Sequence, residues 1–170
     1  MKNYVIIFLL FLSSVLACKK EGLTKATQKG ANTLSCKVDN KLFKPCYERI
    51  IGGPDIPALE GGVLMVDGRR WAIINAQIQC EAMLKSIYLE IANLTGEGEY
   101  LLSKPDNRAI YTYDFVYSSQ YTGKGKIVIT KDDQSKSILS GTFEFSGEDS
   151  INNPGKIVEI SSGRFDISYK

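Results

Sequence analysis

Apolar and polar residues alternate along most of the chain after Thr33, and this alternation is the pattern of half-buried β-strands. Segment 70–80 shows it most clearly. One face of that segment carries every second residue from Ala72 to Cys80, and all of them are apolar. The other face carries Asn75, Gln77 and Gln79, together with Trp71 and Ile73. We therefore predict a strand with one dry face and one mostly wet face.

Turn residues divide these strands into hairpins. Asp39-Asn40 separates segments 34–38 and 41–44, and Asp67-Gly68 separates segments 63–66 and 70–80. Such pairs favour two-residue hairpin turns, and Asn40 is expected to take the left-handed conformation. Segment 47–62, rich in glycine and proline, is predicted to be a long connection.

Seven further strands are expected, and no helix of three turns. The strands are predicted at 87–91, 99–102, 109–117, 121–130, 139–145, 156–161 and 164–169, with a turn at Ser162-Gly163. Only segment 80–86 has room for a helical turn. The whole pattern predicts an all-β, antiparallel two-sheet β-sandwich of about nine or ten strands, with a partly open β-barrel as the alternative.

The first residues have the layout of an export signal, because the basic start Met1-Lys2-Asn3 precedes the apolar run 4–12. That run is too short to span a bilayer, which needs roughly 20 residues. The next residues, Val15-Leu16-Ala17-Cys18, resemble a bacterial lipobox. The resemblance implies a lipoprotein signal peptide at 1–17 and a lipid, palmitate included, on Cys18 as the membrane anchor. We then expect a lipidated tether at 18–31 and an all-β domain at 32–170.

The residue after Cys18 is Lys19 rather than the aspartate associated with inner-membrane retention. The expected location is therefore the outer membrane, on its periplasmic side or at the cell surface.

Both ends of the predicted domain resemble a family of small uncharacterised lipoproteins from Bacteroidota. The resemblance rests on segment 27–38 near the start and on two copies of a G-x-F-acid-apolar pattern, at 141–145 and 163–167. It implies an all-β domain and no particular chemistry. In addition, Asp149-Ser150-Ile151 resembles the short acceptor motif for periplasmic O-glycosylation in Bacteroidota, which makes Ser150 a candidate glycosylation site.

Composition removes several classes of function. The chain has no histidine, which excludes a Ser-His-Asp or Cys-His nucleophile, an HExxH zinc helix and any histidine-ligated metal. The 21 basic residues nearly balance the 19 acidic ones, so nucleic-acid binding is not expected. Asp132, Asp133 and Asp149 lack the spacing of a calcium loop. We predict no catalytic residue, no cofactor and no metal site.

Three cysteines follow Cys18 in a chain predicted to lie in an oxidising compartment. Cys46 and Cys80 are both expected at strand ends beside loops, and this favours a disulfide between them. A bridge between Cys36 and Cys80 is the second alternative. In the first case Cys36 is a buried free thiol.

Tyr111, Tyr113, Phe115 and Tyr117 alternate along one predicted strand and form an aromatic row. A row of tyrosines suits stacking on a glycan or on a partner protein, although core packing explains the same pattern.

Taken together, the sequence predicts a lipid-anchored β domain of the cell envelope that is not an enzyme. Its activity is unknown, and it acts by binding an unknown protein or glycan partner or by a structural role. The first alternative is a lipocalin-like carrier of a small apolar ligand. The second is a hydrolase that uses carboxylates alone, with Glu144, Glu159 and Asp166 as the candidates.

Overall fold

The structure is a computed structural model, and it describes residues 22–47, 57–103, 106–149 and 151–169. Strands dominate it. They are β1 (Thr33–Val38), β2 (Lys41–Phe43), β3 (Leu59–Val66), β4 (Arg69–Ile78), β5 (Lys85–Ile91), β6 (Gly98–Leu101), β7 (Asn107–Thr112), β8 (Val116–Ser118), β9 (Gly125–Asp133), β10 (Ile138–Glu148) and β11 (Ile157–Ser168). One short helix, α2 (Ser119–Thr122), follows β8. No helix in the described ranges is long and apolar enough to cross a membrane.

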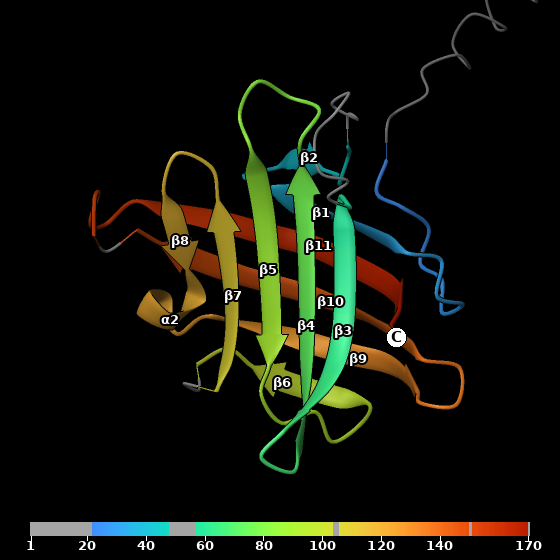
Figure 1. Cartoon of the computed structure of the whole chain (residues 1–170). Coiled ribbons are helices and arrows are strands. Elements are labelled where there is room, and N and C mark those ends of the chain that lie inside the picture. Colours follow the sequence, from blue (N-terminus) through green and yellow to red (C-terminus); the bar gives the residue numbers. More distant parts are fainter. Residues whose placement is uncertain (1–21, 48–56, 104–105, 150, 170) are drawn as a thin grey trace, which may run out of the picture.

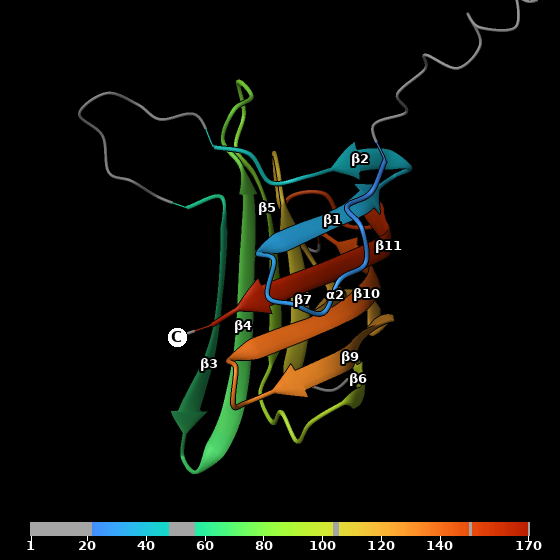
Figure 2. The same ribbon diagram turned by 90° about the vertical axis from the view of Figure 1, so that its right-hand side faces the viewer.

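The strands form one antiparallel sheet that folds over into two layers, whose strands cross each other in Figure 1. The first layer has the order β3-β4-β5-β7-β8. The second contains β2, β1, β11 and β10, and β9 extends it to β6. A single pair, Ser118 opposite Glu148, joins β8 to β10. Figure 2 shows the first layer edge-on, with the strands of the second layer stacked beside it. The all-β prediction is confirmed. Because the sheet folds into two layers but does not close, the fold is consistent with both the predicted two-sheet sandwich and the alternative, a partly open barrel.

Alternating burial builds the core between the layers. Ala72, Ile74, Ala76 and Ile78 of β4 are buried, as the dry face of segment 70–80 predicted. They face apolar residues of the second layer such as Leu34, Leu139 and Phe165, which belong to the same cluster. Both predicted hairpin turns are confirmed. Asp39, Asn40, Asp67 and Gly68 all have positive φ angles, which two-residue turns of this kind require.

The two G-x-F segments lie opposite each other on β10 and β11. Gly141 pairs with Phe165, and Phe143 pairs with Gly163. A Cβ on Gly141 would lie 2.7 Å from the Phe165 ring, and one on Gly163 would lie 2.7 Å from the Phe143 ring. Each glycine therefore leaves the space that the opposite phenylalanine fills, which explains why the pattern occurs twice.

The start of the described chain is bound to the second layer. The backbone N–H groups of Lys29, Gly30 and Ala31 and the hydroxyl of Thr27 all donate to the carboxylate of Asp166 on β11. Earlier in the chain, Thr24 donates its backbone N–H to the side-chain oxygen of Ser35. Part of the predicted tether 18–31 is therefore hydrogen-bonded to the domain, since Asp166 accepts the backbone N–H groups of residues 29–31 and Ser35 accepts that of Thr24. We use the name N-terminal strap for residues 24–31.

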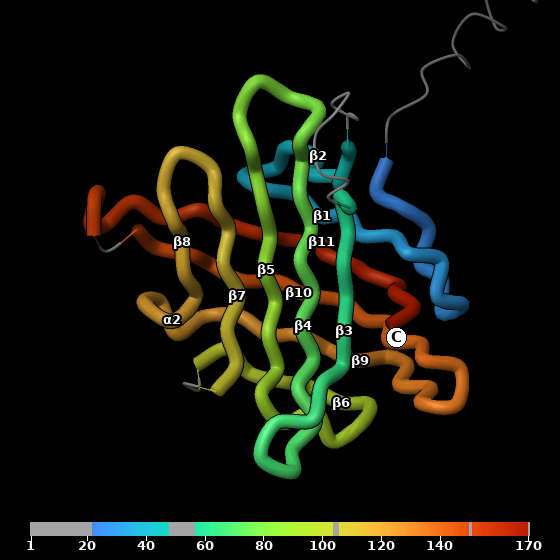
Figure 3. Tube along the Cα trace, in the orientation of Figure 1, coloured from blue at the N-terminus to red at the C-terminus, as the bar shows by residue number. Residues whose placement is uncertain are grey.

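Several predicted boundaries were wrong. Segment 109–117 is a hairpin of β7 and β8 rather than one strand, and 121–130 begins in α2 before β9. Ser162-Gly163 is a bulge inside the continuous β11, with Ser162 at φ 54°. The first half of β3 lies in the predicted 47–62 connection. In segment 80–86, residues 80–83 form bends rather than a helical turn, and Lys85 and Ser86 already belong to β5. Figure 3 traces these connections along the chain.

Candidate functional site

The tyrosines predicted to form a row come from both strands of the β7–β8 hairpin. Tyr111 on β7 pairs directly with Tyr117 on β8, and residues 113–115 make the loop between them. The two rings are stacked with centroids 6.1 Å apart, and both side chains are buried. Tyr113 is exposed at the loop. A single flat row is therefore wrong. Tyr111 and Tyr117 pack in the hydrophobic core, and Tyr113 is exposed to solvent at the loop that joins their strands.

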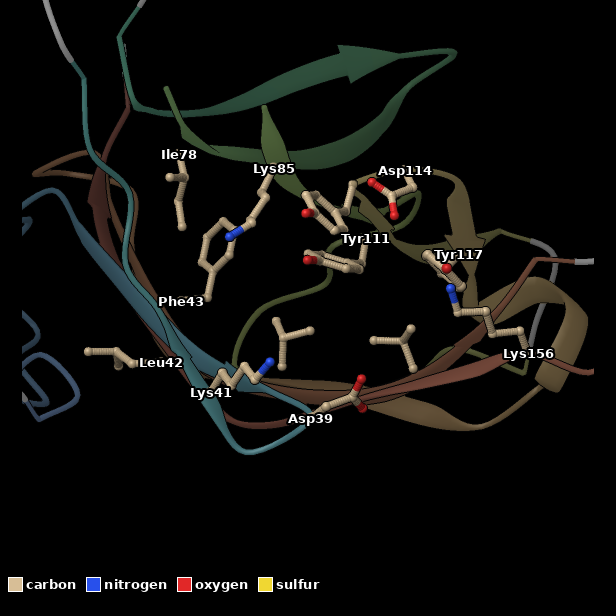
Figure 4. A pocket seen from close by; sticks show the side chains of 13 residues that line it. Asp39, Lys41, Leu42, Phe43, Ile78, Lys85, Tyr111, Asp114, Tyr117 and Lys156 are labelled. Carbon is tan, nitrogen blue, oxygen red and sulfur yellow. The ribbon is translucent and has the colours of Figure 1, made fainter. Parts of the chain in front are cut away.

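These three tyrosines line a pocket of about 280 Å³ between the two layers. Figure 4 shows it from close by. Its floor is apolar, and its rim carries charged side chains. The lining consists of Val38, Asp39, Lys41, Leu42, Phe43, Ile78, Lys85, Tyr111, Tyr113, Asp114, Tyr117, Lys156 and Val158. Pockets that hold small ligands have this makeup, an apolar interior with a few polar groups.

The pocket is assembled from segments that are distant in sequence. The β1–β2 turn supplies Asp39, and β2 supplies Lys41 and Phe43. The first layer supplies Ile78 at the end of β4 and Lys85 at the start of β5. Figure 4 shows Asp39 and Lys41 on the wall opposite Tyr111. The site lies at one end of the core, with β2 and the β1–β2 turn on one side and the ends of β4, β5 and β7 on the other.

Two lysines lie over the aromatic rings. The Lys85 ammonium is 5.2 Å from the Tyr113 ring centroid. The Lys156 ammonium is 5.5 Å from the Phe115 centroid and 5.6 Å from that of Tyr117. Interaction with the Tyr117 side chain raises the pKa of Lys156, so this group stays charged. Such cation–π contacts hold positive charge at the mouth of the pocket.

Tyr111 keeps its proton throughout the physiological range. Burial raises its pKa to about 12, and the neighbouring Tyr113 adds to the effect. Its hydroxyl is therefore a hydrogen-bond donor as well as an acceptor. With the lysines as donors and Asp39 and Asp114 as acceptors, the pocket can bind a ligand that carries several hydroxyl groups or an anionic group.

The cysteine prediction is confirmed in full. Cys46 and Cys80 form a disulfide, with their Cα atoms 5.7 Å apart, and Cys36 is free and buried. Burial raises the pKa of Cys36 to about 12, so the side chain stays a protonated thiol at neutral pH, and the thiolate is the form that acts as a nucleophile. The disulfide lies beside the pocket, because the backbone of Cys46 forms an isolated β-bridge with Ile78, and Ile78 lines the pocket. It therefore fixes β2 and its connection against the end of β4.

The candidate carboxylates have different surroundings. Asp166 is buried, and its hydrogen bonds to the N-terminal strap and to Ser140 occupy both oxygens. Glu144 is exposed, and Glu159 accepts a hydrogen bond from Ser146 at 2.8 Å. Asp132 is held by both terminal nitrogens of Arg70. Within the described part of the chain, no three metal-ligating side chains gather into a candidate metal site.

Two predicted modification sites, Cys18 and Ser150, lie outside the described residues. Next to Ser150, Asp149 is buried and caps a turn by accepting the N–H groups of Ile151 and Asn152. The other Asp149 oxygen is buried without a hydrogen-bond partner. The predicted signal peptide, residues 1–17, is likewise outside the described ranges.

Sequence comparison places the chain in a family. A family model described as "Domain of unknown function (DUF6252)" matches residues 73–166, more than half of the chain. The chain belongs to this family. No curated protein and no solved structure matches it. The prediction of an uncharacterised domain family is thereby confirmed, and the matched region contains β5, β7 and β8 with the tyrosines of the pocket.

Sequence reasoning found the tyrosines but not the residues opposite them. Lys41, Lys85 and Lys156 are ordinary surface lysines by sequence, and Asp39 is visible only as a turn residue. Asp166 was expected on a polar face, yet it is the buried anchor of the N-terminal strap. No sequence signal marks this role, because Asp166 alternates with Phe165 and Ile167 as an outward-facing strand residue does and Arg164 lies two residues before it.

Proposed function

We propose that this protein is a lipid-anchored binding domain of the cell envelope, with the tyrosine pocket as its binding site and no enzymatic activity. The observation that carries the proposal is the pocket itself. Three tyrosines, two ring-bound lysines and two carboxylates surround one apolar cavity. Tyrosine supplies a flat apolar surface with a polar tip, which suits ligands that are only partly apolar.

The ligand class that fits these groups best is a saccharide with a carboxylate or sulfate group. A sugar ring offers an apolar face to Tyr113 and hydroxyl groups to Tyr111, Asp39 and Asp114. Its anionic group would find Lys85 and Lys156 at the rim. A pocket of about 280 Å³ lies near the lower limit for small-molecule sites, so one or two sugar units are expected to enter it.

Membrane anchoring rests on the sequence around Cys18, which resembles a lipobox, and outer-membrane location rests on Lys19 following it. Metabolic labelling with a palmitate analogue tests the anchor. The wild-type protein should be labelled and the Cys18→Ser variant should not. An unlabelled wild-type protein would remove the anchor from the proposal and leave the pocket untouched.

Thermal unfolding tests the binding site. The mature chain is heated with glucuronate, with a sulfated disaccharide, with uncharged glucose and with laurate. A ligand at 100 times its dissociation constant stabilises by about 2.7 kcal/mol, which shifts the midpoint by several degrees.

Tyr113→Ala should abolish the shift produced by an anionic sugar. Tyr121→Ala is the matched control, because Tyr121 is exposed but does not line the pocket. A shift with laurate instead would favour a carrier of apolar ligands, for which Phe43, Ile78 and Val158 provide the lining. Equal shifts in both tyrosine variants would refute the assignment of the site.

A further inference from the structure

Exposed apolar side chains form two groups at opposite ends of the molecule, one on β2 and the β4–β5 loop and the other beside the β3–β4 turn. The first, at what we call the mouth end, comprises Leu42, Met83 and Leu84, whose exposed fractions are 36%, 47% and 54%. The second, at the hairpin end, includes Leu64 and Met65, whose exposed fractions are 51% and 67%. In Figures 1 and 2 the loop between β4 and β5 is at the top and the β3–β4 turn is at the bottom.

The chain enters the domain at the mouth end. In both views the first described residues lie next to β2, on the same side of the molecule as the β4–β5 loop. The N-terminal strap fixes this position, since Thr24 is hydrogen-bonded to Ser35 and the backbone of residues 29–31 to Asp166. The point at which the chain leaves toward Cys18 is therefore a constant feature of the domain surface.

The covalent distance from this point to the proposed lipid is short. Gly22 is four residue steps from Cys18, and such a segment spans at most about 14 Å. A lipid on Cys18 inserted in a bilayer would therefore hold Gly22, and with it the mouth end, close to the membrane surface. The hairpin end would point away from that surface.

We infer that the mouth end docks on the bilayer that holds the lipid anchor, with Leu42, Met83 and Leu84 inserted at the interface. The inference rests on the proposed lipidation of Cys18. Lys41 and Lys44 flank Leu42, and lysines of this kind can reach headgroups while their stems lie along apolar surface. The Cys46–Cys80 disulfide joins the chain just after β2 covalently to the start of the β4–β5 loop, so the two parts of this surface are linked.

Charge contributes little to this docking. Around the mouth end, the lysines Lys41, Lys44, Lys85 and Lys156 exceed the acids Asp39, Glu81 and Asp114 by only one charge. Lys85 also pairs with Glu81. Apolar insertion is therefore the dominant attraction, and the contact should persist at high salt and in membranes without anionic lipid.

The docked orientation also sets where the pocket opens. Leu42, Lys41 and Lys85 belong both to the mouth end and to the pocket lining. The site would then border the headgroup layer, where a ligand held at the membrane surface reaches it first.

Spin labelling of the full lipidated chain tests the inference. A nitroxide label is placed on Leu84→Cys or on the matched Leu64→Cys variant. In the native protein the disulfide and the burial of Cys36 leave these introduced thiols free to react selectively. Each protein is reconstituted into vesicles of phosphatidylethanolamine, with and without phosphatidylglycerol. Accessibility to oxygen, which concentrates in the bilayer, is compared with accessibility to a water-soluble nickel complex.

The label at 84 should lose nickel accessibility and gain oxygen accessibility on vesicles, at a depth of about 5–10 Å. The label at 64 should keep the values that it has in detergent. Flotation of the vesicles reports the anchor separately. Protein that floats while position 84 stays in water would overturn the docking inference and leave the lipid anchor intact. Protein that does not float would overturn both. A Met83→Cys label repeats the test if Leu84→Cys fails to fold.

Discussion

The two ends of this sheet expose similar amounts of apolar side chain but are built in different ways. The hairpin end is local, because β3 and β4 are joined by the tight turn Asp67-Gly68. The mouth end joins β2, the β4–β5 loop and the β7–β8 loop, which are far apart in sequence. A disulfide holds the mouth end, and a pocket opens beside it.

The difference shows that exposed apolar surface does not identify a functional end by itself. Leu64 and Met65 are as exposed as Met83 and Leu84. What separates the ends is the route of the chain, because the N-terminal strap delivers residue 22 beside β2. The end that lies near the proposed anchor also contains the tyrosines and lysines of the candidate site.

Removal of the disulfide should have the largest effect on stability. The cysteines are 34 residues apart, and in the chain-entropy model closing such a loop contributes roughly 4 kcal/mol. Urea unfolding of a Cys46→Ala/Cys80→Ala variant should show a loss of about this size. Wild-type protein treated with a reductant should lose a similar amount, and the double variant should lose nothing further. Unchanged stability on reduction would contradict the importance of this bridge.

Counting the thiols that react in folded protein tests whether the free cysteine in the core and the disulfide at the mouth end differ in accessibility. Native protein should react with no thiol reagent at Cys36, because the side chain is buried and its pKa is raised to about 12. Reduction of folded protein should expose only Cys46 and Cys80 at the mouth end. Labelling of Cys36 under native conditions, read by mass spectrometry of peptides, would show that the core opens there.

The Asp166→Asn substitution should release the N-terminal strap. Burial alone would raise the pKa of Asp166, but donors from Thr27, Lys29, Ser140 and Gly30 outweigh it and lower the pKa to about 2. Because the folded pKa lies below the unfolded value of about 3.9, this group stabilises the fold above pH 4. The contribution, roughly 2 kcal/mol, is lost as the pH falls from about 4 through 2.

Unfolding measured against pH should therefore show a wild-type advantage over Asp166→Asn at pH 7 that disappears in acid. Glu144→Gln is the control, because Glu144 is exposed and its loss of charge should change stability little. A constant difference between wild type and Asp166→Asn at all pH values would show that the charge of Asp166 does not hold the strap.

A pair of neighbouring glycines on β3 tests how the open edge packs. A Cβ on Gly61 would lie 2.2 Å from the Ile167 Cδ1 atom, whereas a Cβ on Gly62 would meet nothing within 4 Å. Gly61→Ala should cost about 1–3 kcal/mol by overpacking, and Gly62→Ala should be neutral or stabilise by up to about 1 kcal/mol. Thermal unfolding of the two variants measures the difference. Equal effects would mean that β3 and β11 do not pack together.

The smallest effects are expected from the exposed apolar residues themselves. Met83→Ser/Leu84→Ser and Leu64→Ser/Met65→Ser should each change the free energy of unfolding in solution by about 0.5 kcal/mol or less per residue. Urea unfolding without membranes checks this. A large loss at the mouth end alone would indicate that Met83 and Leu84 serve the core rather than an external contact.

The features predicted best from the sequence are those that neighbouring residues determine, namely hairpin turns and the buried faces of strands. Asp39-Asn40 and Asp67-Gly68 determine hairpins by their own backbone preferences, and the alternation in β4 and β5 determines which face is buried. The β7–β8 loop was missed because Tyr111, Tyr113, Phe115 and Tyr117 continue the alternation through it. Ser162-Gly163 was predicted to be a turn because turns and bulges favour the same residue types. Only the pairing of β11 with β10 and β1 on both sides of these residues shows that they form a bulge.

The candidate site was predicted only in part for a similar reason. Its tyrosines form a visible cluster in sequence, whereas Lys156 and Asp39 join it through long-range packing of the second layer. The strap was missed because its donors are backbone N–H groups, which no side-chain pattern reveals.

Hydrogen–deuterium exchange of the lipidated chain, compared between detergent and vesicles, tests the difference between the ends most directly. We predict that vesicles slow exchange in segments 41–44 and 79–84 and leave segment 63–68 unchanged. Slower exchange at 63–68, or no change at the mouth end, would contradict the assignment of the mouth end as the functional end of the protein.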